Sequence, residues 1–191
     1  MPRPRLSTAS VVSAAVELVD ERGPGDLTLA AVARRTGVAT PSLYKHVPSV
    51  EALRQRVSAR VTAELASVLS SAIAGRSGEE AVRSLASAYR DYALSFPGRY
   101  PLTQHVPDPQ DPEHVAAAEL AVQTFFAALR GYGLGGEEAI HATRVARSAL
   151  HGFVSLEIDG GFGLPHHVGR SFECCVSALD VSLRNWAEVA R

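Results

Sequence analysis

Lysine is almost missing from this chain, since Lys45 stands alone among nineteen basic residues, and cysteine occurs only as the neighbours Cys174 and Cys175. One adjacent pair of cysteines cannot staple a fold, which favours a reducing cytoplasm. The first ten residues, "MPRPRLSTAS", lack the apolar core of a signal peptide. The longest apolar tract, residues 115–129, is interrupted by Glu119 and Gln123 and is too short to cross a bilayer. We therefore expect a cytoplasmic protein with no membrane partner.

Alternating valine-rich runs, which are typical of strands, are also missing, whereas alanine is abundant. With 46% hydrophobic and 20% charged residues the chain is not disordered. The sequence predicts an all-α fold. It has no Gly-x-Ser-x-Gly, no phosphate-cradling glycine loop after a strand and no His-Glu-x-x-His, so we expect neither an enzyme nor a cofactor. The adjacent pairs 166–167 (His-His) and 174–175 (Cys-Cys) lack the spacing of a tetrahedral metal site, and we expect no metal.

Helix boundaries follow from capping residues and from proline and glycine. Ser7 is expected to cap a helix that ends near Arg22, and Thr28 a short second helix that ends before Gly37. Thr40 is expected to cap a third helix, with proline in its first position. A fourth helix spans about 49–75. Further helices are expected at about 78–96, 112–131, 137–159 and 165–190. We predict a three-helix domain over residues 1–48 and a larger helical domain over 49–191, joined through the fourth helix.

Charge is unevenly distributed. Residues 1–60 hold nine basic and five acidic side chains, whereas the remainder holds ten basic and fifteen acidic ones. Two short helices joined by a glycine-containing turn inside the basic third have the layout of a helix-turn-helix, whose second helix enters the major groove of DNA. Leu43 and Val47 should point inward. The side chains expected to face DNA are Thr40, Pro41, Ser42, Tyr44, Lys45 and His46.

The segment "LTLAAVARRTGVATPSLYKHVPSVEAL", preceded by "ASVVSAAVELVDERG", resembles the DNA-binding domain of the TetR family of transcriptional regulators over about residues 7–55. The resemblance implies that the third helix reads the operator through its matching residues, Thr40, Pro41, Ser42 and Tyr44. It implies that Lys45 and His46 contact the DNA backbone, and that Thr28 contacts a phosphate. Many family members carry a lysine at the start of the fourth helix, where this chain has Ser-Val-Glu at residues 49–51.

Residues of about 80–180 resemble a TetR C-terminal domain class named for a Trp-His-Gly motif. The segments that carry this resemblance are "YRDYALSFPGRYPL", "LHGFVSLEIDGGFGLP" and "SFE". His151-Gly152 match the motif, while Ala149-Leu150 stand where a tryptophan is expected. The resemblance implies that the last two helices pair with those of a second subunit. A two-fold dimer would then present two recognition helices to a palindromic DNA site, with half-sites roughly 34–36 Å apart.

The family usually binds a small-molecule effector among its C-terminal helices. The candidates for an effector pocket are Tyr89, Tyr92, Phe96, His105, Phe125 and His151. The alternatives are that the aromatic residues form plain core, that His151 is structural and that His105 is solvated. Arg3 and Arg5 could form an arm in the minor groove or a frayed end, and residues 34–35 (Arg-Arg) read as a solvated face.

We therefore predict a homodimeric TetR-type transcription factor, a repressor that binds double-stranded DNA at a palindromic operator and is released by a small-molecule effector. The first alternative is a DNA-binding regulator of the same fold without such a ligand. The second is a helical interaction module or an enzyme that does not bind DNA.

Overall fold

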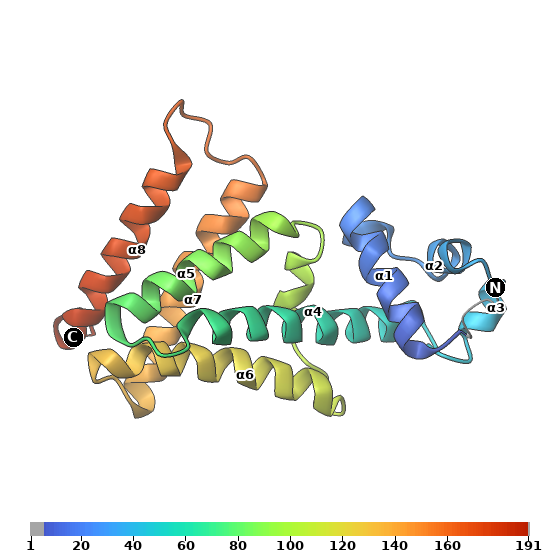
Figure 1. Cartoon of the computed structure of the whole chain (residues 1–191), viewed down its shortest axis with the longest axis horizontal. Coiled ribbons are helices and arrows are strands. Elements are labelled where there is room, and N and C mark those ends of the chain that lie inside the picture. Colours follow the sequence, from blue (N-terminus) through green and yellow to red (C-terminus); the bar gives the residue numbers. More distant parts are fainter. Residues whose placement is uncertain (1–5, 191) are drawn as a thin grey trace. The chain divides into compact units, whose positions relative to one another are not determined.

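The computed structural model describes residues 6–190, and Arg3 and Arg5 lie outside this range. The described residues form helices and no strand (Figure 1), which confirms the all-α prediction. The α-helices are α1 (Thr8–Arg22), α2 (Leu29–Thr36), α3 (Thr40–Leu43), α4 (Val50–Ile73), α5 (Gly78–Ser95), α6 (Pro112–Leu129), α7 (Gly136–Ile158), α8 (Val168–Arg184) and α9 (Trp186–Val189). Short 3-10 turns are η1 (Pro24–Asp26), η2 (Tyr100–Gln104) and η3 (Arg130–Tyr132).

The first two helices begin and end as their local sequence predicts. The Ser7 hydroxyl accepts a hydrogen bond from the Ser10 backbone N–H at 3.1 Å, which caps α1. The Thr28 hydroxyl accepts one from the Ala31 N–H at 3.1 Å, which caps α2. Gly37, with φ of 70°, ends α2 in the left-handed conformation that glycine adopts without strain.

The third helix differs from the prediction at its start. Ala39, with extended φ and ψ of −72° and 140°, is the residue before α3, so Thr40 is the first helical residue and makes no capping bond. Pro41 fits because N–H groups in the first turn have no helical partner. After Leu43 the chain continues as a turn, in which the Val47 N–H bonds the Leu43 carbonyl at 2.9 Å.

The end of the chain also differs from the single helix predicted at 165–190. His167 is still extended, and α8 begins at Val168. Asn185, with φ and ψ of −107° and 28°, then interrupts the helix, and its side-chain amide donates to the Val181 carbonyl at 2.8 Å. The Asn185 backbone N–H donates to the same Val181 carbonyl at 3.2 Å, so Asn185 closes the last turn of α8 with both its backbone and its side chain.

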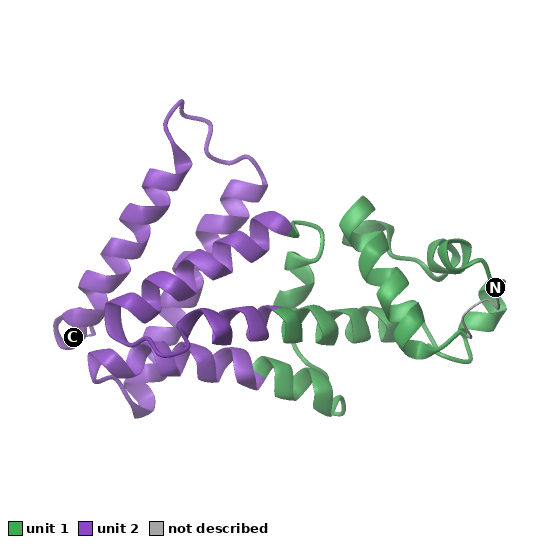
Figure 2. Ribbon diagram, viewed as in Figure 1, with its two compact units in different colours: residues 1–64, 96–118 green, residues 65–95, 119–191 purple. Residues whose placement is uncertain are grey.

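The chain divides into two compact units (Figure 2). Unit 1 comprises Met1–Glu64 and Phe96–Ala118, and unit 2 comprises Leu65–Ser95 and Glu119–Arg191. The functional division after residue 48 stays a prediction. Unit 1 has a core of buried side chains from α1, α2, α3 and the first half of α4, which Leu102 of η2 joins from the later segment.

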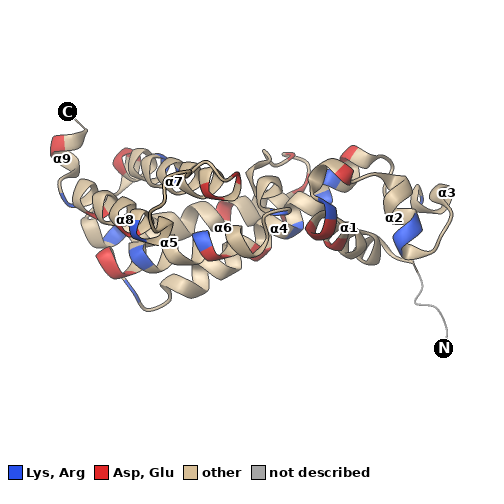
Figure 3. Ribbon diagram, turned by 90° about the horizontal axis from the view of Figure 1, so that it is seen from above, with Lys and Arg blue, Asp and Glu red and all other residues tan. Residues whose placement is uncertain are grey.

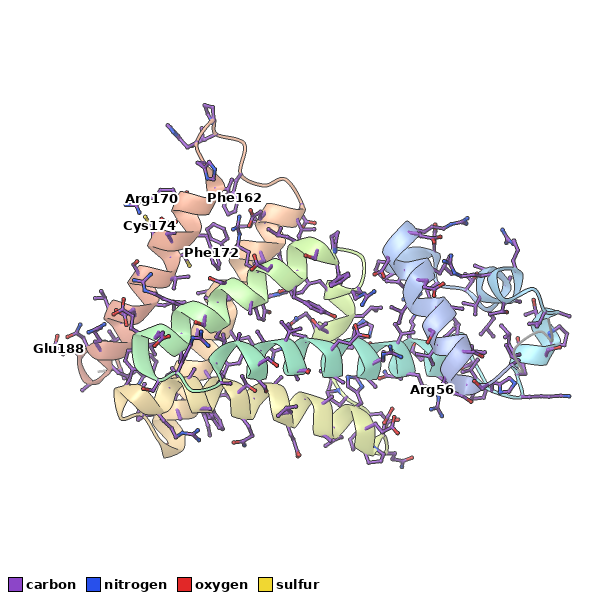
Figure 4. The ribbon with its side chains drawn as sticks, in the orientation of Figure 1. Arg56, Phe162, Arg170, Phe172, Cys174 and Glu188 are labelled. Atoms are coloured by element: carbon purple, nitrogen blue, oxygen red, sulfur yellow. The ribbon has the colours of Figure 1, made fainter. Side chains whose placement is uncertain are left out.

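Unit 2 contains α5, α7, α8 and the second half of α6, and polar pairs link its helices. The Tyr132 hydroxyl donates to Asp180 at 2.6 Å, and Arg90 donates to Glu157 at 2.7 Å. Figure 4 labels Phe162 between α7 and α8 and Phe172 on α8. Each ring contacts Phe153, with centroids 4.9 Å and 5.2 Å apart, respectively. No helix among residues 6–190 is long and apolar enough to span a membrane.

Candidate nucleic-acid interface

Helices α2 and α3 form a helix-turn-helix. The link between them is the short segment Gly37–Ala39, and the Val38 N–H bonds the Ala33 carbonyl at 3.0 Å. Leu43 and Val47 are fully buried in the core of unit 1, as the sequence predicted. A four-residue helix cannot be stable alone, so its position depends on this packing against α1 and α2.

The opposite side of the α3 segment faces solvent. Pro41, Tyr44 and Lys45 are exposed, with 55% of Tyr44 accessible. Thr40, Ser42 and His46 are half-buried. The structure therefore places six of the residues expected to contact DNA, Thr40, Pro41, Ser42, Tyr44, Lys45 and His46, on one short segment whose buried side is formed by Leu43 and Val47. Thr28, the seventh, lies at the start of α2.

A hollow of about 460 Å³ connects this segment with two helix starts. It is lined by Gly25, Leu27, Thr28, Leu29, Tyr44, Pro48, Ser49, Val50 and Arg54. Thr28 caps α2 and Ser49 caps α4, because the Ser49 hydroxyl accepts from the Ala52 N–H at 3.0 Å. Arg54 also lines this hollow, although it was not among the residues predicted to contact DNA. The signal in the sequence is its place about one turn after Ser49, the cap of α4, because the start of α4 follows α3 closely in the chain.

Arg35 is not a merely solvated side chain, as had been expected for Arg34 and Arg35. Its guanidinium donates to Glu21 at 2.7 Å and to Glu17 at 3.0 Å, and so ties α2 to α1. The acidic positions of α1 and the basic positions of α2 can be followed in Figure 3. The hydrogen bond from Arg35 is the main reason that the pKa of Glu21 is lowered. Arg34 is exposed.

The residues predicted to meet an effector fall in both units. In unit 2, Tyr89, Tyr92 and Phe125 are buried. His151 is half-buried, and its pKa is lowered by burial and by the charge of Arg147.

In unit 1, the guanidinium of Arg99 lies 4.2 Å from the centre of the Phe96 ring, and His105 Nδ1 lies 3.1 Å from the Ser58 hydroxyl. Their role in effector binding stays a prediction. Within residues 6–190 no group of three or more His, Cys, Asp or Glu side chains could hold a metal ion.

Family models match both parts of the chain. Residues 11–57 match the bacterial regulatory proteins of the tetR family, and residues 82–179 match the Tetracyclin repressor-like C-terminal domain. A curated relative, the uncharacterized HTH-type transcriptional regulator Rv0681 of Mycobacterium tuberculosis, is 43% identical over 157 residues, covering 82% of this chain and 72% of the relative. The chain belongs to the TetR family.

A second relative of this TetR-family regulator is the uncharacterized HTH-type transcriptional regulator YobS of Bacillus subtilis, 34% identical over 155 residues and covering 81% of each chain. Among solved structures, the TetR-Q116A protein of Acinetobacter baumannii AYE in complex with minocycline has a TM-score of 0.73 at 20% identity, with 95% of this chain and 98% of that chain covered. At that identity the likeness concerns the fold. The protein is thus a transcriptional regulator with a helix-turn-helix DNA-binding domain, not an enzyme.

Proposed function

We propose that this TetR-family regulator is a repressor, which binds a palindromic operator as a homodimer and is released by a small-molecule effector. The observation that carries the proposal is the α3 segment, since its polar and aromatic side chains face solvent while Leu43 and Val47 fix it to the core. A rigidly held short helix suits entry into the major groove.

The proposed contacts divide by chemistry. Thr40, Pro41 and Ser42 of α3, with Tyr44 directly after it, read base edges. Lys45 and His46 contact phosphates, which contribute affinity but little sequence information. Thr28 contacts a phosphate at the edge of the hollow, and Arg54 supplies there the basic group that many relatives place at the start of the fourth helix.

The homodimer is supported by an uncharged stripe along α8. The stripe consists of exposed side chains at helical spacing, Ser171, Cys174, Ala178 and Val181; Figure 4 labels Cys174 on this helix. Val181 is 58% exposed, although it is apolar. A second copy of α8 would cover this stripe and the same face would be used by both subunits, as a two-fold axis requires.

The effector proposal rests on the domain type and on the residues Tyr89, Tyr92, Phe96, His105, Phe125 and His151. An effector can release DNA only to the extent that it prefers the released conformation. Minocycline is bound by the Acinetobacter protein, whose likeness to this chain concerns the fold. No particular effector is proposed from it.

The test is fluorescence anisotropy of DNA fragments taken from beside the gene of this protein. We expect one palindromic fragment to bind specifically, with an affinity that falls steeply as salt increases. If no fragment binds more tightly than random DNA, the proposal that the protein binds an operator is wrong. If binding is specific but no compound in a broad library changes thermal stability or releases DNA, the protein is a regulator without a ligand.

A further inference from the structure

A second hollow in unit 1, of about 380 Å³, is lined by residues of α1, of α4 and of the start of α6. Its volume lies at the small end of the range for ligand sites, which is roughly 300–1,000 Å³. None of the residues predicted to contact DNA or an effector lines it. This hollow is therefore separate from the sites proposed above.

The hollow carries charges of both signs. Arg56 and Arg60 line it from α4, and Asp111 and Glu113 line it from the start of α6. Arg60 is already paired, since its Nε donates to Glu64 at 2.9 Å. The side chains of Arg56 and Glu113 are exposed, and neither has a hydrogen bond or an ion pair within residues 6–190. A guanidinium and a carboxylate thus line one hollow without bonding each other, so both are open to a ligand that carries the two opposite charges.

The two helix starts at this hollow favour different groups. At α6, the Asp111 carboxylate accepts from two backbone N–H groups of the first turn, at 3.2 Å and 3.1 Å, so these donors are already used. The carboxylate of Glu113 then adds a negative charge there. At α1, the first two residues, Thr8 and Ala9, line the hollow, and N–H groups in the first turn of a helix favour an anion. Arg56 and the start of α1 therefore favour a carboxylate group, whereas Glu113 favours a cation.

The remaining lining of the hollow is small and apolar. Ala59 and Ala63 lie one turn apart on α4, and Val12 lies on α1. Figure 4 shows Arg56 on the side of α4 where α6 begins. A short aliphatic group of a ligand would leave water on this apolar lining, which favours binding.

We propose that this hollow binds a small zwitterion, an amino acid with a short aliphatic side chain, as a second ligand of the regulator. Arg56 binds its carboxylate group, Glu113 binds its ammonium group, and its side chain packs on Ala59 and Ala63. The ligand contacts helices of the unit that carries the helix-turn-helix, since α1 and α4 share its core. The site goes beyond the effector proposal and does not depend on it.

Four probes with the same propyl side chain test the site in the full-length protein without DNA: norvaline, N-acetylnorvaline, norvalinamide and N-acetylnorvalinamide. Acetylation removes the positive charge, the amide removes the negative charge, and the last compound lacks both. The readout is the NMR signal of the Arg56 Nε–H in protein labelled at arginine, assigned by its loss in Arg56→Gln, at constant ionic strength. We expect norvaline to shift this signal saturably at roughly millimolar concentration and the two singly charged probes to need at least about fivefold more. N-acetylnorvalinamide should have no effect.

Glu113→Gln and Glu119→Gln form a matched pair of variants. Both remove an exposed carboxylate of α6, but Glu119 does not line the hollow and belongs to unit 2. Neither change should unfold the protein, because an exposed charge contributes little to stability. We expect Glu113→Gln to weaken norvaline binding about fivefold, the loss of one charged contact, and to leave N-acetylnorvaline binding unchanged, because that probe has no ammonium group. Glu119→Gln should change neither.

The proposal is overturned if N-acetylnorvaline binds as tightly as norvaline, if Glu113→Gln binds norvaline normally, or if no probe shifts the Arg56 signal. The first result would show that the hollow binds anions in general. Operator binding is measured on the same sample. Specific DNA binding without a norvaline response refutes this site alone, whereas a norvaline response without specific DNA binding refutes the repressor proposal.

Discussion

Arg99 and Asp20 lie 79 residues apart in the sequence, and the Arg99 Nε donates to the Asp20 carboxylate at 2.8 Å. The same guanidinium donates to Glu64 of α4 at 2.7 Å. Only 12% of the Arg99 side chain is accessible. One side chain from the segment after α5 therefore joins the end of α1 to α4, so the helix-turn-helix and this later segment form one folded body within unit 1.

Replacing Arg99 by glutamine should lower the free energy of unfolding by about 2 kcal/mol, because it leaves two partly buried carboxylates without their charged donor. Chemical denaturation with circular dichroism measures this. Arg170→Gln is the control, since its pair with Glu173 is exposed and should contribute nothing measurable. Equal stability of the two variants would show that Arg99 does not hold the segment in place.

Gly98 precedes this arginine and has no room for a side chain. A Cβ there would stand 2.3 Å from the Val19 carbonyl oxygen. Gly98→Ala should therefore cost about 1–3 kcal/mol by forcing the segment away from α1. Gly152, inside α7, has no atom in the way. Gly152→Ala should instead stabilise by about 0.5–1 kcal/mol, because alanine favours a helix. Thermal denaturation of both variants measures these effects. We expect the melting temperature to fall in Gly98→Ala and to rise in Gly152→Ala.

Features that depend on residues close together in the sequence, such as helix caps and the buried side of a helix, were predicted correctly. Ser7 and Thr28 cap helices as expected, because the donor that each hydroxyl reaches lies three residues ahead. The buried side of α3 followed from the spacing of Leu43 and Val47. The role predicted for Thr40 was wrong. A threonine directly before proline can be either the cap of a helix or its first residue, and the extended backbone of Ala39 shows that Thr40 is the first residue.

What the sequence did not predict depends on residues far apart in the chain. Nothing near Arg99 identifies Asp20 or Glu64 as its partners, and the pairing of Arg35 with α1 likewise needs the packed helices. The burial of His114 was missed for the same reason. Acidic residues precede it at positions 111 and 113 and apolar ones follow from Val115, so the local pattern is ambiguous, and only packing in unit 1 removes it from water.

DNA binding should separate two kinds of residue in the segment Thr40–His46, which comprises α3 and the turn after it. Lys45→Ala should weaken binding to all sequences alike and reduce the salt slope of log K by about 1, since one phosphate contact is lost. Tyr44→Ala should cost about 1–3 kcal/mol on the operator and less on random DNA. Anisotropy titrations at several salt concentrations measure both. Arg130→Ala, an exposed arginine outside the helix-turn-helix, is the control. If Tyr44→Ala weakens binding to the operator and to random DNA equally, Tyr44 contacts the DNA backbone and does not read a base.

Stability should fall as the pH drops below about 6.5, the usual pKa of an unfolded histidine. Burial lowers the pKa of both His114 and His151 in the fold, so they stay neutral while the unfolded chain takes up protons. The loss is complete once the pH passes below the folded pKa values. Urea denaturation between pH 7.5 and pH 5 measures it. His114→Phe should flatten this dependence, and His141→Phe, which changes an exposed histidine, should not.

The lowered pKa of Asp180 keeps the effect of this carboxylate separate from that of the two histidines. Burial alone would raise the pKa of Asp180, but hydrogen bonds from Tyr132 and Arg184 outweigh it and lower that pKa. The stabilisation by Asp180 is therefore present above its ordinary pKa and lost only as the pH falls through the lowered value. A pH dependence between 7.5 and 5 that persists unchanged in His114→Phe and in His151→Phe would contradict the assignment to these two rings.

Dimerisation through α8 predicts that a charge in the uncharged stripe separates the subunits. Val181→Glu should shift the protein to monomer in sedimentation velocity, because two glutamates would meet across the two-fold axis. Operator affinity should fall at least about a hundredfold, since each half-site then binds alone. Val106→Glu alters a valine that is 83% exposed in unit 1 and should leave both properties unchanged. A Val181→Glu protein that remains dimeric would place the subunit interface on another face.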